Sequence, residues 1–338
     1  MAHRWTPSQA QAWYSRQPWL VGVNFTPSSA VNQLEMWQAE TFDLQTIRRE
    51  LGWAASLGFN TIRTYLHNLA WEVDPQGFKR RLDQFLSITA GFGIHPILVI
   101  FDDCWNNDPQ PGPQPAPRPG VHNSGWVQSP GTRQVLDPAA WPRLESYVSD
   151  VLGSFARDER ILLWDLYNEP GNNQLAEKSL PLLGMAFAWA RAAATLQPLS
   201  VAVWSDNEAL NDMILSESDV ITFHNFDDVH SLEAQIQALK AFDRPLICSE
   251  YMARGRGSRF ETHLPVFRRE GIGCLSWGLV SGKTQTIYPW DSPPGAPEPQ
   301  EWFHDIFRPD GSPFDMGEVE FIKKIIQGKN LTTRYYHL

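Results

Sequence analysis

The chain has 338 residues and carries 28 lysines and arginines against 38 aspartates and glutamates, which gives a formal net charge of −10. This acidic balance argues against a nucleic-acid partner, because binding a phosphate backbone requires clustered basic side chains. With 42% hydrophobic and 20% charged residues, the chain has enough apolar side chains for a large core and is not disordered. It also contains 15 tryptophans, whose flat apolar face and single N–H donor suit sugar rings as well as packing.

Several features bear on the compartment. The sequence has no run of 18 apolar residues, so we expect no membrane-spanning segment. The first eight residues, MAHRWTPS, lack the apolar run of a secretory signal peptide. The three cysteines, Cys104, Cys248 and Cys274, are typical of reduced, buried thiols. We therefore expect a cytoplasmic protein, with a secreted mature form as the alternative.

Short apolar runs alternate with segments of helical periodicity along the chain. The expected strands cover residues 19–25, 59–66, 95–102, 161–167, 199–204, 220–226, 245–251 and 272–280. The expected helices cover residues 43–57, 75–92, 141–156, 175–196, 231–242, 260–269 and 318–326, with a further short helix before the sixth strand. Eight strands that alternate with helices predict an α/β protein, a (β/α)8 TIM barrel with its chemistry at the C-terminal strand ends. An open, doubly wound sheet is the alternative.

Two proline-rich segments interrupt this alternation. Residues 108–120 have proline at every second position from 109 to 119, and residues 288–300 are also rich in proline. Proline at this density forbids helix and favours an extended arm. We expect both segments to rim the C-terminal face of the barrel, within loop insertions at about 103–137 and 281–313. The whole chain, 1–338, is then a single domain with its barrel core at about 19–327.

If the barrel is correct, the residues that end the strands converge on one site. Glu169 and Glu250 end the fourth and seventh strands, which lie on opposite sides of a barrel cavity. A carboxylate beside such apolar runs costs free energy unless it is paired or functional. Two carboxyl groups across a sugar-sized cleft are typical of glycoside hydrolysis. The other polar or aromatic strand-end residues are Asn24, Arg63, His67, Asp102, Asp103, Asn168, Trp204, Asp206, His224, Asn225 and Trp277.

Three short motifs carry a resemblance to a known group of enzymes. They are YNEP at 167–170, SEY at 249–251 and LSWG at 275–278, on the expected fourth, seventh and eighth strands. Together they resemble the clan A glycoside hydrolases, most closely family 5. The resemblance implies a retaining β-glycoside hydrolase that cleaves a β-linked oligo- or polysaccharide by double displacement, with carboxyl groups about 5–5.5 Å apart. It implies a carbohydrate substrate, no cofactor and no metal.

The same resemblance assigns roles to individual side chains. Glu250 would be the nucleophile and Glu169 the general acid/base. Asn168 would hold the sugar 2-hydroxyl, and Arg63 would support the nucleophile through charge-assisted hydrogen bonds that lower its pKa. His224 would lie near the acid/base.

Tryptophans at strand ends and in rim loops are the expected sugar contacts. Trp277 resembles the platform under the sugar whose bond is cleaved. Trp105, Trp126 and Trp290 are the other tryptophans that we expect to touch sugar, and Trp126 belongs to a possible substrate loop, HNSGW at 122–126.

Some positions depart from the family pattern. Phe226 stands where the family usually has a tyrosine that hydrogen-bonds the nucleophile, so Tyr251 and Tyr288 are candidates for that hydroxyl. The family's histidine after the third strand is missing from its place, where the run DDCW stands at 102–105. We take Asp102 from this run as a supporting residue, and His122 as the histidine candidate.

The run GKT at 282–284 echoes part of a phosphate-binding loop. The full spacing and the following helix are absent, so nucleotide binding is disfavoured. We expect instead that Lys283 reaches the substrate from the eighth strand.

Two other function classes remain open on the sequence. One is a divalent-metal barrel, such as a sugar isomerase or metal-dependent hydrolase, with Asp102, Glu169, His224 and Glu250 as ligands. The other is a carbohydrate-binding barrel without catalysis.

Overall fold

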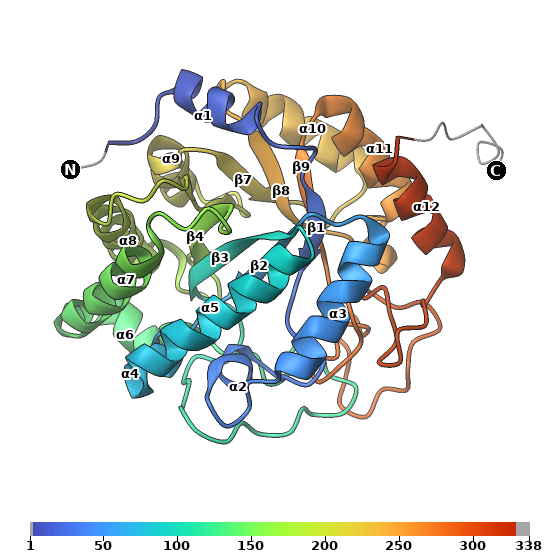
Figure 1. Ribbon diagram of the computed structural model, residues 1–338, viewed down its shortest axis with the longest axis horizontal. Coiled ribbons are helices and arrows are strands. Elements are labelled where there is room, and N and C mark those ends of the chain that lie inside the picture. Colours follow the sequence, from blue (N-terminus) through green and yellow to red (C-terminus); the bar gives the residue numbers. More distant parts are fainter. Residues whose placement is uncertain (1–2, 329–338) are drawn as a thin grey trace.

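The computed structural model describes residues 3–328, in which nine parallel strands form one sheet surrounded by helices (Figure 1). Every expected strand is present. The strands are β1 (Val21–Asn24), β2 (Thr61–Tyr65), β3 (His95–Asp102), β4 (Leu163–Asn168), β5 (Leu199–Ser200), β6 (Ala202–Val203), β7 (Ile221–His224), β8 (Leu246–Tyr251) and β9 (Gly273–Trp277).

The sheet closes into a barrel through its fifth strand. The strand order is β5-β4-β3-β2-β1-β9-β8-β7-β6, so the two ends of the sheet are the consecutive segments β5 and β6. The expected single strand at 199–204 is split at Val201, because β5 pairs with β4 while β6 pairs with β7. This closure confirms the (β/α)8 barrel and excludes the open, doubly wound alternative.

Helices connect consecutive strands and pack around the sheet. They are α1 (Pro7–Tyr14), α2 (Gln33–Trp37), α3 (Leu44–Leu57), α4 (Asn68–Val73), α5 (Pro75–Gly91), α6 (Thr132–Leu136), α7 (Trp141–Phe155), α8 (Leu180–Ala192), α9 (Glu208–Glu217), α10 (Val229–Lys240), α11 (Phe260–Glu270) and α12 (Met316–Ile326). Three short 3₁₀ turns are η1 (Pro138–Ala140), η2 (Ala176–Ser179) and η3 (Arg254–Arg256).

Local sequence explains why the strands and helices form where they do. Strand β3 is apolar at nearly every position and buried along its length except for His95, as expected of a sheet covered on both faces. Helix α3 begins after Asp43, whose side chain accepts a hydrogen bond from the Thr46 amide at 3.0 Å. It ends at Gly58, which has a φ of 93°, a left-handed conformation that glycine adopts readily.

The expected helix at 175–196 is shorter than predicted. Its first turn is the 3₁₀ turn η2, because Ala176 has a φ of 48° and interrupts the α-helical path. Helix α8 begins at Leu180, where Pro181 fits the first turn, and ends two residues before Ala194, which has a φ of 50°. Helices α1, α2, α4 and α6 were not predicted.

Helix α1 covers the N-terminal end of the barrel. Trp13 on α1, with Trp5 before it, packs against barrel residues including Leu20, Ile97 and Leu163. Apolar side chains thus fill this end of the barrel, and a ligand reaches the interior from the opposite, C-terminal face.

The proline-rich segment 108–120 contains neither helix nor strand, as predicted. It docks on the end of α2, where Gln38 exchanges two hydrogen bonds with the backbone of Gly112, at 2.6 and 2.9 Å. Within residues 3–328, no helix is both long and apolar enough to cross a membrane.

Candidate active site

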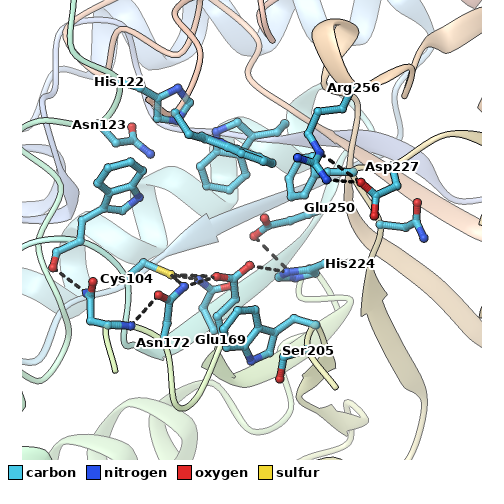
Figure 2. Close-up of a pocket in the computed structure, with 18 of the residues that line it drawn as sticks. Cys104, His122, Asn123, Glu169, Asn172, Ser205, His224, Asp227, Glu250 and Arg256 are labelled. Carbon is cyan, nitrogen blue, oxygen red and sulfur yellow. Dashed lines mark hydrogen bonds and ion pairs between the residues drawn. The ribbon is translucent and has the colours of Figure 1, made fainter. Parts of the chain in front are cut away.

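A pocket of about 700 Å³ opens at the C-terminal ends of the strands, and Figure 2 shows most of the side chains that line it. This volume is within the range of small-molecule sites. Both strand-end glutamates, Glu169 and Glu250, line the pocket. The other lining residues are Cys104, Trp105, His122, Asn123, Trp126, Asn168, Asn172, Asn173, Trp204, Ser205, Asp206, His224, Asn225, Phe226, Asp227, Ser231, Gln235, Arg256, Trp277 and Trp290.

The two glutamates face each other across this pocket. One carboxylate oxygen of Glu169, one of Glu250 and a ring nitrogen of His224 all lie within 4.8 Å of one another. These carboxylate oxygens are therefore closer together than the roughly 6.5–9.5 Å that separates the carboxyl groups of an inverting glycosidase.

Arg63 organises a buried hydrogen-bond network beneath the pocket. Its Nη1 donates to Glu250 Oε1 at 2.5 Å and to Asn24 Oδ1 at 3.0 Å. Its Nη2 donates to Asn168 Oδ1 at 2.7 Å, and its Nε to Asp165 Oδ2 at 2.9 Å. Burial alone would lower the pKa of Arg63, but the surrounding acidic groups raise it above its ordinary value. The side chain is therefore a fixed cation that touches one glutamate.

Tyr65 supplies the hydroxyl that was expected from another part of the chain. Its hydroxyl donates to Glu250 Oε1 at 2.7 Å and accepts from Arg63 Nη1. The sequence had suggested Tyr251 or Tyr288 for this hydroxyl, and that prediction is corrected. Tyr251 packs into the core against Phe267, with ring centroids 5.0 Å apart.

The second candidate, Tyr288, contacts His122 through its carbonyl oxygen. The signal for Tyr65 was present in the sequence, because residues two apart on a strand share a face, and Arg63 was already assigned to the site.

Glu169 is held by three neutral groups. It directly follows β4 and has a φ of 44°, a conformation that is uncommon for a non-glycine residue. Its Oε2 accepts from Asn172 Nδ2 at 2.6 Å and from the Cys104 thiol at 3.2 Å, and its Oε1 lies 2.9 Å from His224 Nδ1. The sequence reasoning did not identify Cys104 or Asn172 as site residues.

The two carboxyl groups differ in their electrostatic surroundings. Burial raises the pKa of both Glu169 and Glu250 above the ordinary value. At Glu250, the neighbouring His224 and the Arg63 guanidinium, which contacts that carboxylate directly, oppose this rise in pKa. Among the described residues, Glu169 has no ion pair with a lysine or arginine. Direct contact with a fixed cation therefore favours the ionised form of Glu250, whereas the groups that hydrogen-bond Glu169 are neutral.

His224 lies between the two carboxyl groups, as Figure 2 shows. Burial lowers its pKa to about 4, so the imidazole is neutral near pH 7. In one tautomer, Nδ1 accepts a hydrogen bond from protonated Glu169. In the other, Nδ1 carries the proton and donates a hydrogen bond to ionised Glu169. Its Nε2 is 3.6 Å from Glu250 Oε1 and has no hydrogen-bond partner within residues 3–328.

Asp102 lies below the pocket and does not line it. Its Oδ1 accepts from Asn168 Nδ2 at 2.9 Å, and its Oδ2 accepts from Trp126 Nε1 at 2.7 Å. Burial raises the pKa of Asp102 to about 6. The expected supporting residue therefore contacts Asn168 and Trp126, which line the pocket, and does not line it itself.

Aromatic side chains form much of the pocket wall. The four tryptophans expected to touch sugar, Trp105, Trp126, Trp277 and Trp290, all line it, and so does Trp204. Trp126 and Trp277 pack edge to face, with ring centroids 6.2 Å apart. A tryptophan ring that lines the pocket suits the apolar face of a sugar ring.

His122 also lines the pocket and stacks on Trp105, with ring centroids 5.5 Å apart. Burial lowers the pKa of His122 to about 4. Its Nδ1 lies 2.7 Å from the Tyr288 carbonyl oxygen, which fixes the orientation of the ring.

Lys283 does not reach the pocket, which corrects the expectation from the sequence. Its side chain is 43% exposed, and Nζ forms an ion pair with Glu35 Oε1 at 2.6 Å. The backbone after β9 turns this side chain toward α2 and away from the glutamates.

The donor set of the metal alternative is incomplete. Glu169, His224 and Glu250 approach one another closely enough to share an ion, but Asp102 is not among them. The Glu250 oxygen nearest to them accepts from Arg63 and Tyr65, and a guanidinium at 2.5 Å repels a second cation. The residues therefore do not fit a divalent-metal site of the kind considered from the sequence.

Comparison with known proteins identifies solved structures that share this fold. No family model and no curated protein matches the sequence. Among solved structures, an endo-β-1,4-mannanase from Thermotoga petrophila is 14% identical, with a TM-score of 0.61, over 93% of this chain and 78% of that chain. A glycoside hydrolase family 5 mannosidase from Rhizomucor miehei is also 14% identical, with a TM-score of 0.60, over 92% and 93% of the two chains. The barrel thus resembles those of family 5 glycoside hydrolases.

A third similar structure is an exo-β-1,4-mannosidase from Opitutaceae bacterium strain TAV5. It is 16% identical, with a TM-score of 0.63, over 91% of this chain and 59% of that chain. At these identities the likeness extends to the fold alone.

Proposed function

We propose that the protein is a retaining β-glycoside hydrolase in which Glu250 is the nucleophile and Glu169 the general acid/base. The observation that carries this proposal is the pair of carboxyl groups with oxygens within 4.8 Å, one of which contacts the Arg63 cation. This separation suits direct attack by a carboxylate and leaves too little room for an inverting water.

In the first step, Glu250 attacks the anomeric carbon while Glu169 donates its proton to the leaving oxygen. The bond to the leaving group breaks, and a covalent glycosyl-enzyme forms. Glu169, now ionised, then removes a proton from water, which attacks the anomeric carbon and releases Glu250. The electrostatic difference between the two groups supports this assignment, because the ionised nucleophile is the one beside Arg63.

The remaining pocket residues support this reaction in distinct ways. Arg63 and Tyr65 hold Glu250 ionised and in position through hydrogen bonds of 2.5 and 2.7 Å. Asn168 Nδ2 lies at the strand end beside Glu169 and is held by Asp102, which suits it to bind a sugar hydroxyl. Trp277 provides an aromatic face within the pocket.

The substrate class is a β-linked glycoside, and β-mannosides are the first substrates to try. This choice rests on the mannanase and mannosidases among the similar structures, which also include a β-galactosidase from Halorubrum lacusprofundi. β-Glucosides and β-galactosides complete the panel.

The test is hydrolysis of aryl β-glycosides and β-1,4-linked oligosaccharides, with the anomer of the first product followed by NMR. We expect the β-anomer to appear first, and Glu250→Gln to abolish turnover while keeping the thermal unfolding temperature. First release of the α-anomer, or full activity of Glu250→Gln, would refute the mechanism. Activity lost with EDTA and restored by a divalent cation would favour the metal alternative instead.

A further inference from the structure

One side of the pocket is closed by two loops that are hydrogen-bonded to each other. We call this the wall: residues 118–126, after β3, together with residues 282–288, after β9. The Gln285 side chain donates to the carbonyls of Arg118 and Val121 at 2.7 and 3.0 Å and accepts from the Gly120 amide at 3.0 Å. The Asn123 amide donates to the Thr284 carbonyl at 2.8 Å. These contacts join the two loops over several residues.

Hydrogen bonds to segments outside the wall also hold it in place. The Lys283 amide donates to the Ser28 carbonyl at 3.0 Å, and the Gly295 amide donates to the Pro119 carbonyl at 2.7 Å. At Gly120 the loops approach so closely that an added Cβ would lie 2.5 Å from the Ala296 backbone nitrogen.

Among residues 3–328, the cavity found directly behind the wall is too small for a second sugar. A small cavity there, lined in part by Asn123, Trp126 and Trp277, measures about 20 Å³. A single water needs about 10–15 Å³ by the same kind of measure, so this cavity is limited to about one water.

The wall lies on the nucleophile's side of the site. Tyr65, which hydrogen-bonds Glu250, packs against both Trp126 and Trp277, with ring centroids 5.1 and 6.0 Å apart. In Figure 2, His122 and Asn123 lie on the opposite side of Glu250 from Glu169 and Ser205.

In double displacement, the sugar that bonds to the nucleophile lies on that side, and the leaving group lies beside the acid/base. The leaving-group side is more open at Asp206, which follows Ser205, lines the pocket and is exposed.

Asn123 lines the pocket as part of this wall and has a buried, unpaired polar atom. The residue is 1% exposed, and its Oδ1 has no hydrogen-bond partner within residues 3–328. Its backbone is fixed, because its amide bonds Thr284, its carbonyl accepts from the Trp126 amide at 3.0 Å, and its φ is 45°. A buried acceptor left unpaired costs free energy, and a sugar hydroxyl would satisfy it.

We propose that the enzyme is exo-acting and removes single sugars from the non-reducing end of β-linked chains, with Asn123 Oδ1 accepting a hydrogen bond from a hydroxyl of that terminal sugar. The wall occupies the place that the next sugar of a longer chain would need. Asn123 is then a specificity-determining residue, and the inference rests on the proposed glycosidase function.

The first experiment follows the products of β-1,4-mannopentaose and cellopentaose that carry a fluorescent label at the reducing end. For whichever substrate is cleaved, we expect free monosaccharide and labelled tetramer as the only early products. Early labelled dimer or trimer, or labelled monosaccharide released first, would overturn exo action from the non-reducing end. If wild type cleaves neither these nor the aryl glycosides, the proposed function itself fails.

The second experiment tests Asn123 on aryl β-glycosides of single sugars. We expect Asn123→Ala to lower kcat/KM by about 10- to 100-fold, and Asn123→Asp, which keeps an acceptor oxygen and tolerates the same φ, to lower it by less than about 10-fold. Gln110→Ala, on the exposed part of the same loop, is the control and should match wild type.

A deoxy series separates recognition from a structural effect of the substitution. Wild type and Asn123→Ala should have equal kcat/KM on the aryl glycoside that lacks the recognised hydroxyl and unequal values on the others. If Asn123→Ala does not fold, the test uses wild type and Asn123→Asp. We then expect one deoxy position to lower wild-type kcat/KM by about 10-fold or more, and Asn123→Asp to change the size of that loss. Wild-type kcat/KM for Asn123→Ala, or equal losses at every deoxy position, would overturn the role of Asn123.

Discussion

Removing the Tyr65 hydroxyl tests the electrostatic argument for the nucleophile most directly. In wild type, this hydroxyl donates to Glu250 Oε1 at 2.7 Å, and both groups are buried. Burial raises the pKa of Tyr65 well above its ordinary value, so the phenol keeps its proton and remains a donor. Tyr65→Phe removes that donor and leaves the ring, with its packing against Trp126 and Trp277, in place.

The expected magnitude follows from the hydrogen bond. A bond to a charged acceptor contributes about 1.5–3 kcal/mol, and one pKa unit corresponds to about 1.4 kcal/mol. The hydroxyl favours the carboxylate over the carboxylic acid, so Tyr65→Phe should raise the pKa of Glu250 by about one to two units. Because the ionised form is the nucleophile, the acid limb of the kcat/KM profile should move to higher pH by the same amount.

The assay is the pH dependence of kcat/KM on an aryl β-glycoside, with Tyr147→Phe as the matched control. Tyr147 is a buried tyrosine whose hydroxyl lies 3.5 Å from the Ile100 carbonyl oxygen, outside the pocket. The control should leave the acid limb where it is in wild type. An acid limb that stays in place in Tyr65→Phe would refute the assignment of Glu250 as the group that this network keeps ionised.

Three further substitutions probe the acid/base and the edge of the site. Glu169→Gln should lower kcat/KM about 10²- to 10⁴-fold for glycosides with poor leaving groups and much less for dinitrophenyl glycosides, which need no proton; equal losses would argue against its role as the acid. Cys104→Ala removes a donor to Glu169, so it should raise the pKa of Glu169 and shift the basic limb to higher pH, and an unmoved limb would contradict this. Lys283→Ala should keep kcat/KM within about twofold of wild type, because only a surface ion pair is lost. A larger fall in kcat/KM would indicate that Lys283 contacts the substrate after all.

The barrel was predictable because its strands are short apolar runs that alternate with helical periodicity. Both glutamates were identified because each carboxylate follows such a run, where an unpaired charge is costly. The split at Val201 was not predicted, since it depends on which neighbours β5 and β6 pair with and not on local sequence.

The contacts within the site were less predictable than its location. Cys104 and Asn172 reach Glu169 from different loops, and no periodicity relates their positions to the carboxylate. Lys283 illustrates the opposite error, because its place after β9 suggested the pocket while the backbone directs it to Glu35. Local patterns indicate which strand ends meet, whereas the direction of a loop side chain depends on the packing of several loops at once.

The Arg63 network also bears on the charge of Glu250, which changes during the proposed reaction. Arg63 contacts two carboxylates, Glu250 and Asp165, and all three side chains are buried. When Glu250 forms an ester with the sugar, it loses its negative charge, and a buried arginine without another partner would be left uncompensated at high cost. Asp165, whose Oδ2 lies 2.8 Å from Arg63 Nη2, remains as the counterion through that step. The second carboxylate thus allows the cation to stay beside the nucleophile in both the free and the glycosylated enzyme.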